Sequence, residues 1–105
     1  MFSLYKDDIN SVDLNKLEKE LSDIKLIDIR ENFETSMGSV SYAKKVPMNT
    51  LLENPEKYLN KNDEYYIMCQ SGMRSMNASK QLHTLGYKVN NVSGGFSAYR
   101  GKNIK

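Results

Sequence analysis

The feature that most constrains the fold is a short apolar run, residues 65–68 (YYIM), which leads through the loop CQSGMRS into a helical pattern. The run contains aromatic and β-branched residues, which favour a buried strand. Beyond the loop, small and apolar residues recur at helical spacing and end at a glycine that can cap a helix: Ser75, Ala78, Leu82, Leu85 and Gly86. A strand that runs directly into a helix is typical of α/β domains, so this segment predicts a mainly parallel sheet.

The residues before this segment predict a helix followed by a strand. Ser11 can cap a helix over about residues 12–22, where leucines recur at helical spacing among charged residues. Residues 26–29 (LIDI) form an apolar run that only Asp28 interrupts, which indicates a buried strand. The leucines of the helical stripe are Leu14, Leu17 and Leu21.

The remaining segments are shorter and less regular. We expect a short helix at Phe33, a short strand within residues 43–46 and helical turns on either side of Pro55. After the helix that ends at Gly86, residues 89–92 predict a further strand, and residues 96–99 predict a last helical turn.

Strands and helices therefore alternate along the chain, which predicts a single α/β domain over residues 1–105. In parallel sheets, ligands bind beyond the carboxyl ends of the strands. Three of the predicted strands end at residues 28–30, at Cys69 and at residues 93–95. If these strands are neighbours, the three strand ends meet at one edge of the sheet.

The composition narrows the classes of function. The 15 basic and 13 acidic residues are interspersed and give a net charge of +2, so no basic patch of the kind that binds nucleic acid stands out. No apolar run approaches the roughly 20 residues of a membrane span, and Asp7 and Asp8 stand where a secretory signal needs apolar residues. We therefore expect a cytoplasmic protein without nucleic-acid or membrane partners.

The chain has one cysteine and one histidine. These residues cannot form an intrachain disulfide or a structural zinc site, so we expect no metal site, and Cys69 is either an inert core residue or a reactive thiol. His83 lies eight positions after Ser75 on the predicted helix, roughly 12 Å from the loop, which is too far for it to act as the base of a Cys–His pair.

The loop favours the reactive thiol. Cys69 stands between a strand end and a helix start, where unpaired backbone N–H groups and the positive end of the helix dipole stabilise a thiolate and lower its pKa. Gly72 allows the loop to turn tightly, and Arg74 adds a positive charge suited to an anionic ligand. An inert core cysteine would need none of these features.

Four motifs in register resemble the rhodanese family of sulfurtransferases. They are the strand end DIRE at residues 28–31, the segment from Gly38 to Pro47, the CQSGMR loop, and Gly94-Gly95-Phe96 followed by Ala98-Tyr99. The resemblance implies about five parallel strands with helices on both faces and no metal or organic cofactor. It also implies that Cys69 lies in a cradle of backbone amides, takes sulfane sulfur from a donor as a persulfide, and passes it to a thiol or other nucleophilic acceptor.

On this interpretation Cys69 is the catalytic nucleophile, and the substrate-binding residues are Gln70, Ser71, Gly72, Met73, Arg74, Ser75 and Arg30. We expect three supporting residues: Asp28, which interrupts an apolar strand and should accept hydrogen bonds from loop or helix N–H groups, and Gly94 with Gly95, which let the backbone approach the loop. Arg30 either pairs with Glu31 or Glu34 on the surface or faces the pocket.

On the same interpretation we expect the donor to be a small anionic compound, thiosulfate or a persulfide, with a protein as an alternative sulfur donor or acceptor. Gln70 stands where some thiosulfate-using members of the family have arginine, which favours a persulfide. One alternative is a non-enzymatic sulfur-carrier or redox-sensing partner domain. A less favoured one is a cysteine phosphatase or arsenate reductase, whose wider loops place five residues between cysteine and arginine, whereas four separate Cys69 from Arg74.

Overall fold

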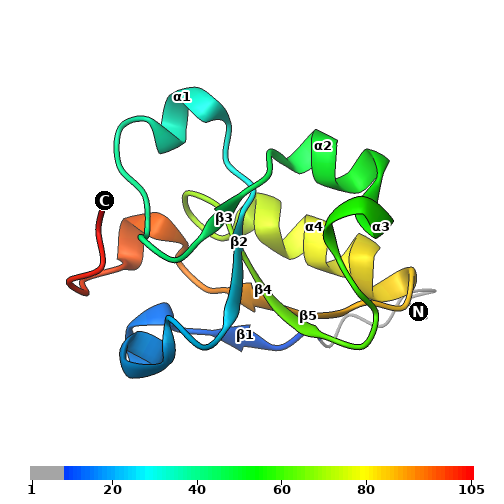
Figure 1. The fold of residues 1–105 in the computed structure, drawn as a ribbon, viewed down its shortest axis with the longest axis horizontal. Coiled ribbons are helices and arrows are strands. Elements are labelled where there is room, and N and C mark those ends of the chain that lie inside the picture. The colour runs from blue at the N-terminus through cyan, green and yellow to red at the C-terminus, as the bar shows by residue number, and fades with distance from the viewer. Residues whose placement is uncertain (1–8) are drawn as a thin grey trace, which may run out of the picture.

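A computed structural model describes residues 9–105. Five parallel strands form one sheet in the order β1-β5-β4-β2-β3 (Figure 1). The strands are β1 (Ser11–Val12), β2 (Lys25–Asp28), β3 (Lys44–Lys45), β4 (Glu64–Met68) and β5 (Lys88–Val92). The helices are the 3-10 helices η1 (Leu14–Glu20) and η2 (Phe96–Ala98) and the α-helices α1 (Asn32–Thr35), α2 (Met48–Glu53), α3 (Pro55–Tyr58) and α4 (Met73–Thr84). The α/β class and the parallel sheet predicted from the sequence are confirmed.

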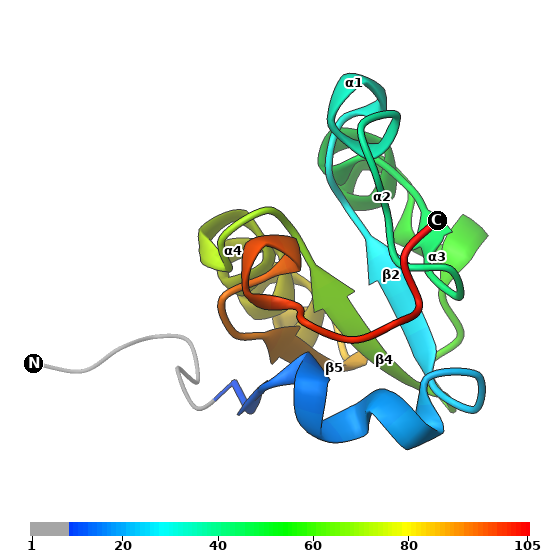
Figure 2. The same cartoon turned by 90° about the vertical axis from the view of Figure 1, so that its left-hand side faces the viewer.

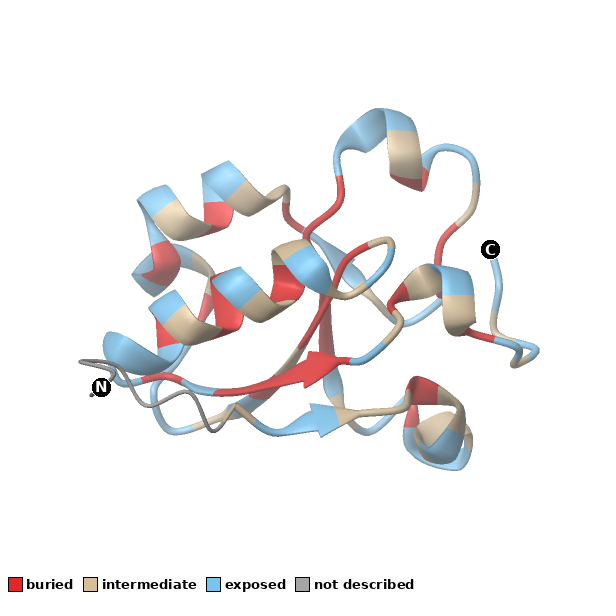
Figure 3. Cartoon of the chain, turned by 180° about the vertical axis from the view of Figure 1, so that it is seen from behind, coloured by how far each residue is buried: buried red, intermediate tan, exposed pale blue. Residues whose placement is uncertain are grey.

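Side chains alternate across the central strand and divide the core into two layers. Tyr65, Ile67 and Cys69 point to one face of β4, where α2, α3 and α4 pack, and Tyr66 and Met68 point to the other. Helices η1 and η2 cover that second face (Figures 1 and 2). Figure 3 shows that the buried residues run along the middle strands and along the sides of the helices that face them. The expectation of helices on both faces is confirmed.

The first helix differs from the prediction. Its N-cap is Asp13, whose Oδ1 accepts a hydrogen bond from the Asn15 backbone N–H at 3.0 Å. The expected cap, Ser11, instead belongs to strand β1, where it lies opposite Asn91 of β5. The helix is also a 3-10 helix and is shorter than predicted. Strand β1 was missed because two residues are too few to show the alternation that identifies a strand.

Leu85 was wrongly expected to continue the buried stripe of the helix that follows the loop. It is 51% exposed, because the helix ends at Leu85 and the chain reverses at Gly86, whose φ is +98°. The Gly86 N–H donates to the His83 carbonyl at 2.9 Å, and the Tyr87 N–H donates to the Leu82 carbonyl at 3.0 Å. This is the Schellman pattern that the glycine predicted, and Tyr87 occupies the core position after it.

The topology brings the three predicted strand ends together. Strand β4 is the middle strand, with β2 on one side and β5 on the other. Asp28 of β2 lies in register with Met68 of β4, and Ile67 lies in register with Asn91 of β5. Because the strands are parallel, Cys69 emerges at the same edge of the sheet as Arg30 and the Gly94-Gly95 turn. Within residues 9–105, no helix is long and apolar enough to cross a membrane.

Candidate active site

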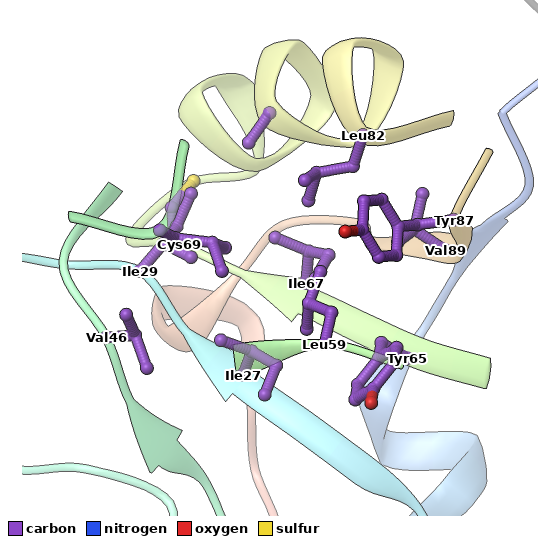
Figure 4. Packing of buried hydrophobic residues seen from close by; sticks show 12 residues of the cluster. Ile27, Ile29, Val46, Leu59, Tyr65, Ile67, Cys69, Leu82, Tyr87 and Val89 are labelled. Carbon is purple, nitrogen blue, oxygen red and sulfur yellow. The ribbon is translucent and has the colours of Figure 1, made fainter. Parts of the chain in front are cut away.

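Cys69 follows β4 directly, and its side chain is only 1% exposed. Figure 4 shows its sulfur pointing from the end of β4 toward the first turn of α4. The backbone N–H groups of Gly72 and Ser75 donate hydrogen bonds to Sγ at 3.1 and 3.3 Å. The Ser75 Oγ also lies 3.3 Å from Sγ. The loop therefore closes around the sulfur, as a cradle of backbone amides would require.

Gly72 makes this closure possible. It is the N-cap of α4 and has a φ of +103°, in the left-handed region that residues with side chains rarely adopt. A Cβ at this position would lie 3.1 Å from the Gly94 backbone nitrogen. The glycine thus serves both the turn of the loop and the close approach of the chain that follows β5.

The surroundings of Cys69 change the pKa of its thiol in two directions. Burial raises the pKa, whereas hydrogen bonds from the Ser75 hydroxyl and from the amides of Ser75, Gly72 and Ser71 lower it. The hydrogen bonds outweigh burial, so the pKa lies below its ordinary value of 9.0. A larger fraction of the thiol is therefore a nucleophilic thiolate near neutral pH.

The Ser75 hydroxyl connects the sulfur to a second buried side chain. It donates a hydrogen bond to Asn91 Oδ1 of β5 at 2.5 Å, and the Asn91 amide in turn donates to Ser11 Oγ of β1 at 3.4 Å. A hydroxyl can donate only one hydrogen bond. While Cys69 is a neutral thiol, the Ser75 hydroxyl accepts from it and donates to Asn91. Once the thiolate forms, the Ser75 hydroxyl can donate its proton to sulfur instead. Asn91 was missed in the sequence, although a polar residue inside a predicted strand was a signal for it.

The expected supporting residue Asp28 forms a buried ion pair with Arg30. Asp28 is 0% exposed and Arg30 is 2% exposed. Both Asp28 carboxylate oxygens accept from the Arg30 guanidinium at 3.0–3.2 Å, and Oδ1 also accepts from the Arg30 backbone N–H at 3.1 Å. The alternative in which Arg30 pairs with Glu31 or Glu34 on the surface is wrong, because the end of β2 is buried and its carboxylate requires a partner there.

The remaining contacts of Arg30 join the cysteine loop to two other segments. One guanidinium nitrogen donates to Gln70 Oε1 at 3.0 Å, and another donates to the Gly38 carbonyl at 2.8 Å. The guanidinium also lies 4.2 Å above the ring of Phe96. Arg30 therefore joins three segments of the site, and Gln70 presents its amide oxygen to this arginine.

Arg74, the cation of the loop, is paired with a carboxylate from another segment. Its two terminal nitrogens each donate to one Glu34 oxygen of α1 at 2.7 Å. The hydrogen bonds from Arg74 lower the pKa of Glu34 to about 2, and the same pairing raises the pKa of Arg74. Because 38% of the Arg74 side chain is exposed, the ion pair lies at the surface beside the buried sulfur. The role of Glu34 as the partner of Arg74 was not found from the sequence, since 40 positions separate them.

The Gly94-Gly95 turn anchors the loop from the side of β5. Beyond the turn, the Phe96 N–H donates to the Cys69 carbonyl at 2.8 Å, and the Ser97 N–H donates to the Gln70 carbonyl at 3.0 Å. These bonds fix the first two peptides of the loop. The small residues were expected to allow this approach.

Two other predicted loop residues, Ser71 and Met73, have side chains that lie outside the cradle, although the Ser71 amide belongs to it. Ser71 is exposed and Met73 is 77% exposed, so their side chains face solvent at the mouth of the loop. His83 is exposed and lies in the last turn of α4, at the end of the helix opposite the loop. Among the described residues, no group of three or more His, Cys, Asp or Glu side chains is placed to hold a metal ion.

Comparisons with known proteins place these features in a family. The sequence model of the rhodanese-like domain matches residues 13–102. "Putative sulfurtransferase YtwF" of Bacillus subtilis is 40% identical over 87 residues, which cover 83% of this chain and 82% of that protein. A protein named "Sulfurtransferase" from Allochromatium vinosum is 33% identical and covers 87% of this chain and 88% of its own length. The crystal structure of a rhodanese-like domain protein from Staphylococcus aureus superposes with a TM-score of 0.83 at 32% identity, over 92% of this chain and 97% of that one.

Proposed function

The chain belongs to the rhodanese-like domain family, and from this membership we propose that it is a sulfurtransferase that carries sulfane sulfur as a persulfide on Cys69. The observation that carries the proposal is the geometry at the sulfur. A buried thiol at the end of the middle strand accepts hydrogen bonds from the Gly72 and Ser75 amides, beside the start of a long helix. Such hydrogen bonds favour a negative charge on sulfur, which is the form that attacks a donor.

In the first step, the Cys69 thiolate attacks the outer sulfur of the donor. The bond between that sulfur and the rest of the donor breaks, and its electron pair leaves with sulfite when the donor is thiosulfate, or with a thiolate when the donor is an organic persulfide. In the second step, an acceptor thiolate attacks the outer sulfur of the Cys69 persulfide, and the electron pair of the broken S–S bond returns to Cys69. The two steps need no external oxidant or reductant.

The residues around Cys69 have supporting roles in this scheme. The amides and the Ser75 hydroxyl hold the charge on the thiolate and then on the enzyme-bound sulfur. Asp28 and Arg30 position the loop through Gln70, and the peptides after the Gly94-Gly95 turn hold the first two carbonyls of the loop. We place this chemistry in the cytoplasm, where reducing conditions keep a lone thiol available.

The decisive experiment is intact-mass analysis after incubation with thiosulfate or glutathione persulfide. The wild-type protein should gain the mass of one sulfur atom, and a reductant should remove it. Cys69→Ser should gain none while it keeps the wild-type circular dichroism spectrum, because serine fits the same space and chain fold. If Cys69→Ser still accumulates transferable sulfur, the proposal is overturned.

Turnover with small donors and acceptors distinguishes an enzyme from a sulfur-carrier domain. An enzyme should pass sulfur repeatedly from the small donor to a small thiol. A carrier should load once and then release its sulfur only to a partner protein. The four-residue spacing between Cys69 and Arg74 gives a tight loop, so we expect no hydrolysis of aryl phosphates.

A further inference from the structure

We propose that Glu34 is a specificity-determining residue. By pairing with Arg74, it disfavours dianionic sulfur donors such as thiosulfate and favours donors whose reacting end carries less charge, such as organic persulfides. This inference rests on the proposed sulfur transfer at Cys69, and it names the class of donor that this site accepts.

The charge balance at the loop supports this inference. Arg74 is the only cationic side chain within the loop from Cys69 to Ser75, and Glu34 offsets its charge through two hydrogen bonds of 2.7 Å. Arg30 also reaches the loop, through Gln70, but the buried Asp28 carboxylate offsets its charge. A dianion that approaches the sulfur therefore meets two arginines whose charges are already compensated, and the Coulomb attraction it gains is small.

Glu34 is held in position independently of Arg74. Its Oε1 also accepts a hydrogen bond from the Glu31 backbone N–H at 2.9 Å, as part of a capping box at the start of α1. Its side chain is 17% exposed. Because its pKa is about 2, Glu34 stays ionised throughout the pH range of any sulfur-transfer assay. The carboxylate is thus a fixed part of the site and is aimed at the loop before a donor arrives.

Apolar side chains flank the ion pair along the chain. Phe33 precedes Glu34 and is 73% exposed, Met37 follows α1 and is 88% exposed, and Met73 precedes Arg74 and is 77% exposed. Large apolar side chains of this kind can pack against the organic part of a persulfide, whereas they offer no hydrogen bond to a sulfonate group. The exposed residues that neighbour the pair in the sequence are therefore apolar, and they add no positive charge that would attract a dianion.

The test compares kcat/KM for thiosulfate with kcat/KM for glutathione persulfide in the wild type and in Glu34→Gln. Glutamine keeps an oxygen that can accept from Arg74 and from the Glu31 N–H, but it removes the charge. The ratio of the thiosulfate value to the persulfide value should rise about fivefold, which corresponds to about 1 kcal/mol for one charge-assisted hydrogen bond that becomes available to the sulfonate. The gain should shrink as salt is added, because Arg74 is partly exposed.

Two further variants make the comparison specific. Glu56→Gln removes the same charge from the exposed surface of α3 and should leave the ratio at its wild-type value. In the double variant Glu34→Gln/Arg74→Gln, the ratio should return toward the wild-type value, because the gain requires a released arginine. If the double variant keeps the full gain, Glu34 does not act through Arg74, and the proposal is overturned.

A second readout does not depend on sulfur transfer. This readout is the rate of Cys69 alkylation by anionic iodoacetate divided by the rate with neutral iodoacetamide. Both reagents react with the thiolate, so the ratio reports the electrostatic potential at sulfur and does not depend on how much of the thiol is ionised. Glu34→Gln should raise this ratio and Glu56→Gln should not. An unchanged alkylation ratio, or an unchanged donor ratio in a protein that loads sulfur, overturns the role of Glu34 and leaves the proposed function standing. If no donor loads Cys69 in any variant, the proposed function fails, and the inference about donors fails with it.

Discussion

The backbone of Gly95 lies directly against the carbonyl group of Cys69, although the two residues belong to different strand ends. Gly95 has a φ of +60° and a ψ of −154°, a combination that is essentially restricted to glycine. A Cβ at Gly95 would collide with the Cys69 carbonyl oxygen and would lie 2.7 Å from the Gln70 carbonyl carbon and oxygen. The peptide after Gly95 donates to this same Cys69 carbonyl. The conformation of the cysteine loop therefore depends on a residue outside it.

Gly95→Ala should displace the loop and reduce sulfur loading at least tenfold. It should also lower the free energy of unfolding by more than the roughly 1–3 kcal/mol that backbone strain alone costs, because the added Cβ collides with the loop. Gly86→Ala is the matched control. Gly86 also has a positive φ of +98°, but a Cβ there would meet only the flexible Lys61 side chain at 3.6 Å. It should therefore lose about 1 kcal/mol and load sulfur normally. Chemical denaturation and intact mass measure both effects, and normal loading by Gly95→Ala would refute the dependence.

Ser75→Ala should raise the pKa of the Cys69 thiol, because it removes the Ser75 hydroxyl, whose hydrogen bond to sulfur lowers that pKa. The thiolate fraction at neutral pH then falls, and alkylation by iodoacetamide at that pH should slow. Ser79→Ala, one turn further along α4, is the control. Its hydroxyl is buried without a hydrogen-bond partner, so its removal should leave the thiol pKa unchanged and should not destabilise the fold. The rate of alkylation against pH gives the midpoint in each variant, and an unchanged midpoint in Ser75→Ala would contradict the prediction.

Arg30→Ala should destabilise the protein by about 3–5 kcal/mol, since it leaves the Asp28 carboxylate buried without its counterion. The surface pair of Lys25 and Asp63 provides the comparison. Its charged groups are 3.7 Å apart and their side chains are 57% and 40% exposed, so Lys25→Ala should cost less than about 0.5 kcal/mol. Urea denaturation of the two variants measures the difference. Equal losses of unfolding free energy in the two variants would show that burial does not determine how much the Arg30 pair contributes to stability.

The pairing of Glu34 with Arg74 should appear in the pH dependence of stability. Folding lowers the pKa of Glu34 from 4.5 to about 2, so the stabilisation is fully present above the unfolded value and is lost as the pH falls toward about 2. Because 38% of the Arg74 side chain is exposed, we expect only about 1 kcal/mol between wild type and Glu34→Gln at pH 6. Glu56→Gln corrects for net charge. Denaturation midpoints from pH 6 to pH 2 should converge for wild type and Glu34→Gln, and a constant gap would argue against the ion pair.

The sequence by itself determined the order of the main elements and the position of the reactive residue. The apolar runs that became β2 and β4, the short segment that became β5 and the stripe that became α4 are local patterns, because strand and helix periods are set by neighbouring residues. The motif around Cys69 is equally local, since a strand end, a glycine turn and a helix start follow one another within a few residues. The 3-10 form of η1 and the two-residue strand β1 depend on packing and show no such local pattern. The sequence therefore could not predict them.

Only the tertiary structure decided which charged and polar groups are partners. In the sequence, Arg30 has three carboxylates nearby: Asp28, Glu31 and Glu34. Spacing alone could not tell which of them pairs with the arginine. Burial of the end of β2 assigns Asp28 to Arg30, and the packing of α1 beside the loop assigns Glu34 to Arg74. Asn91 likewise reaches Ser75 only because β5 lies next to β4. Electrostatic and hydrogen-bond partners are set by distances of a few ångströms across the fold, and these distances follow from the sheet order rather than from local sequence.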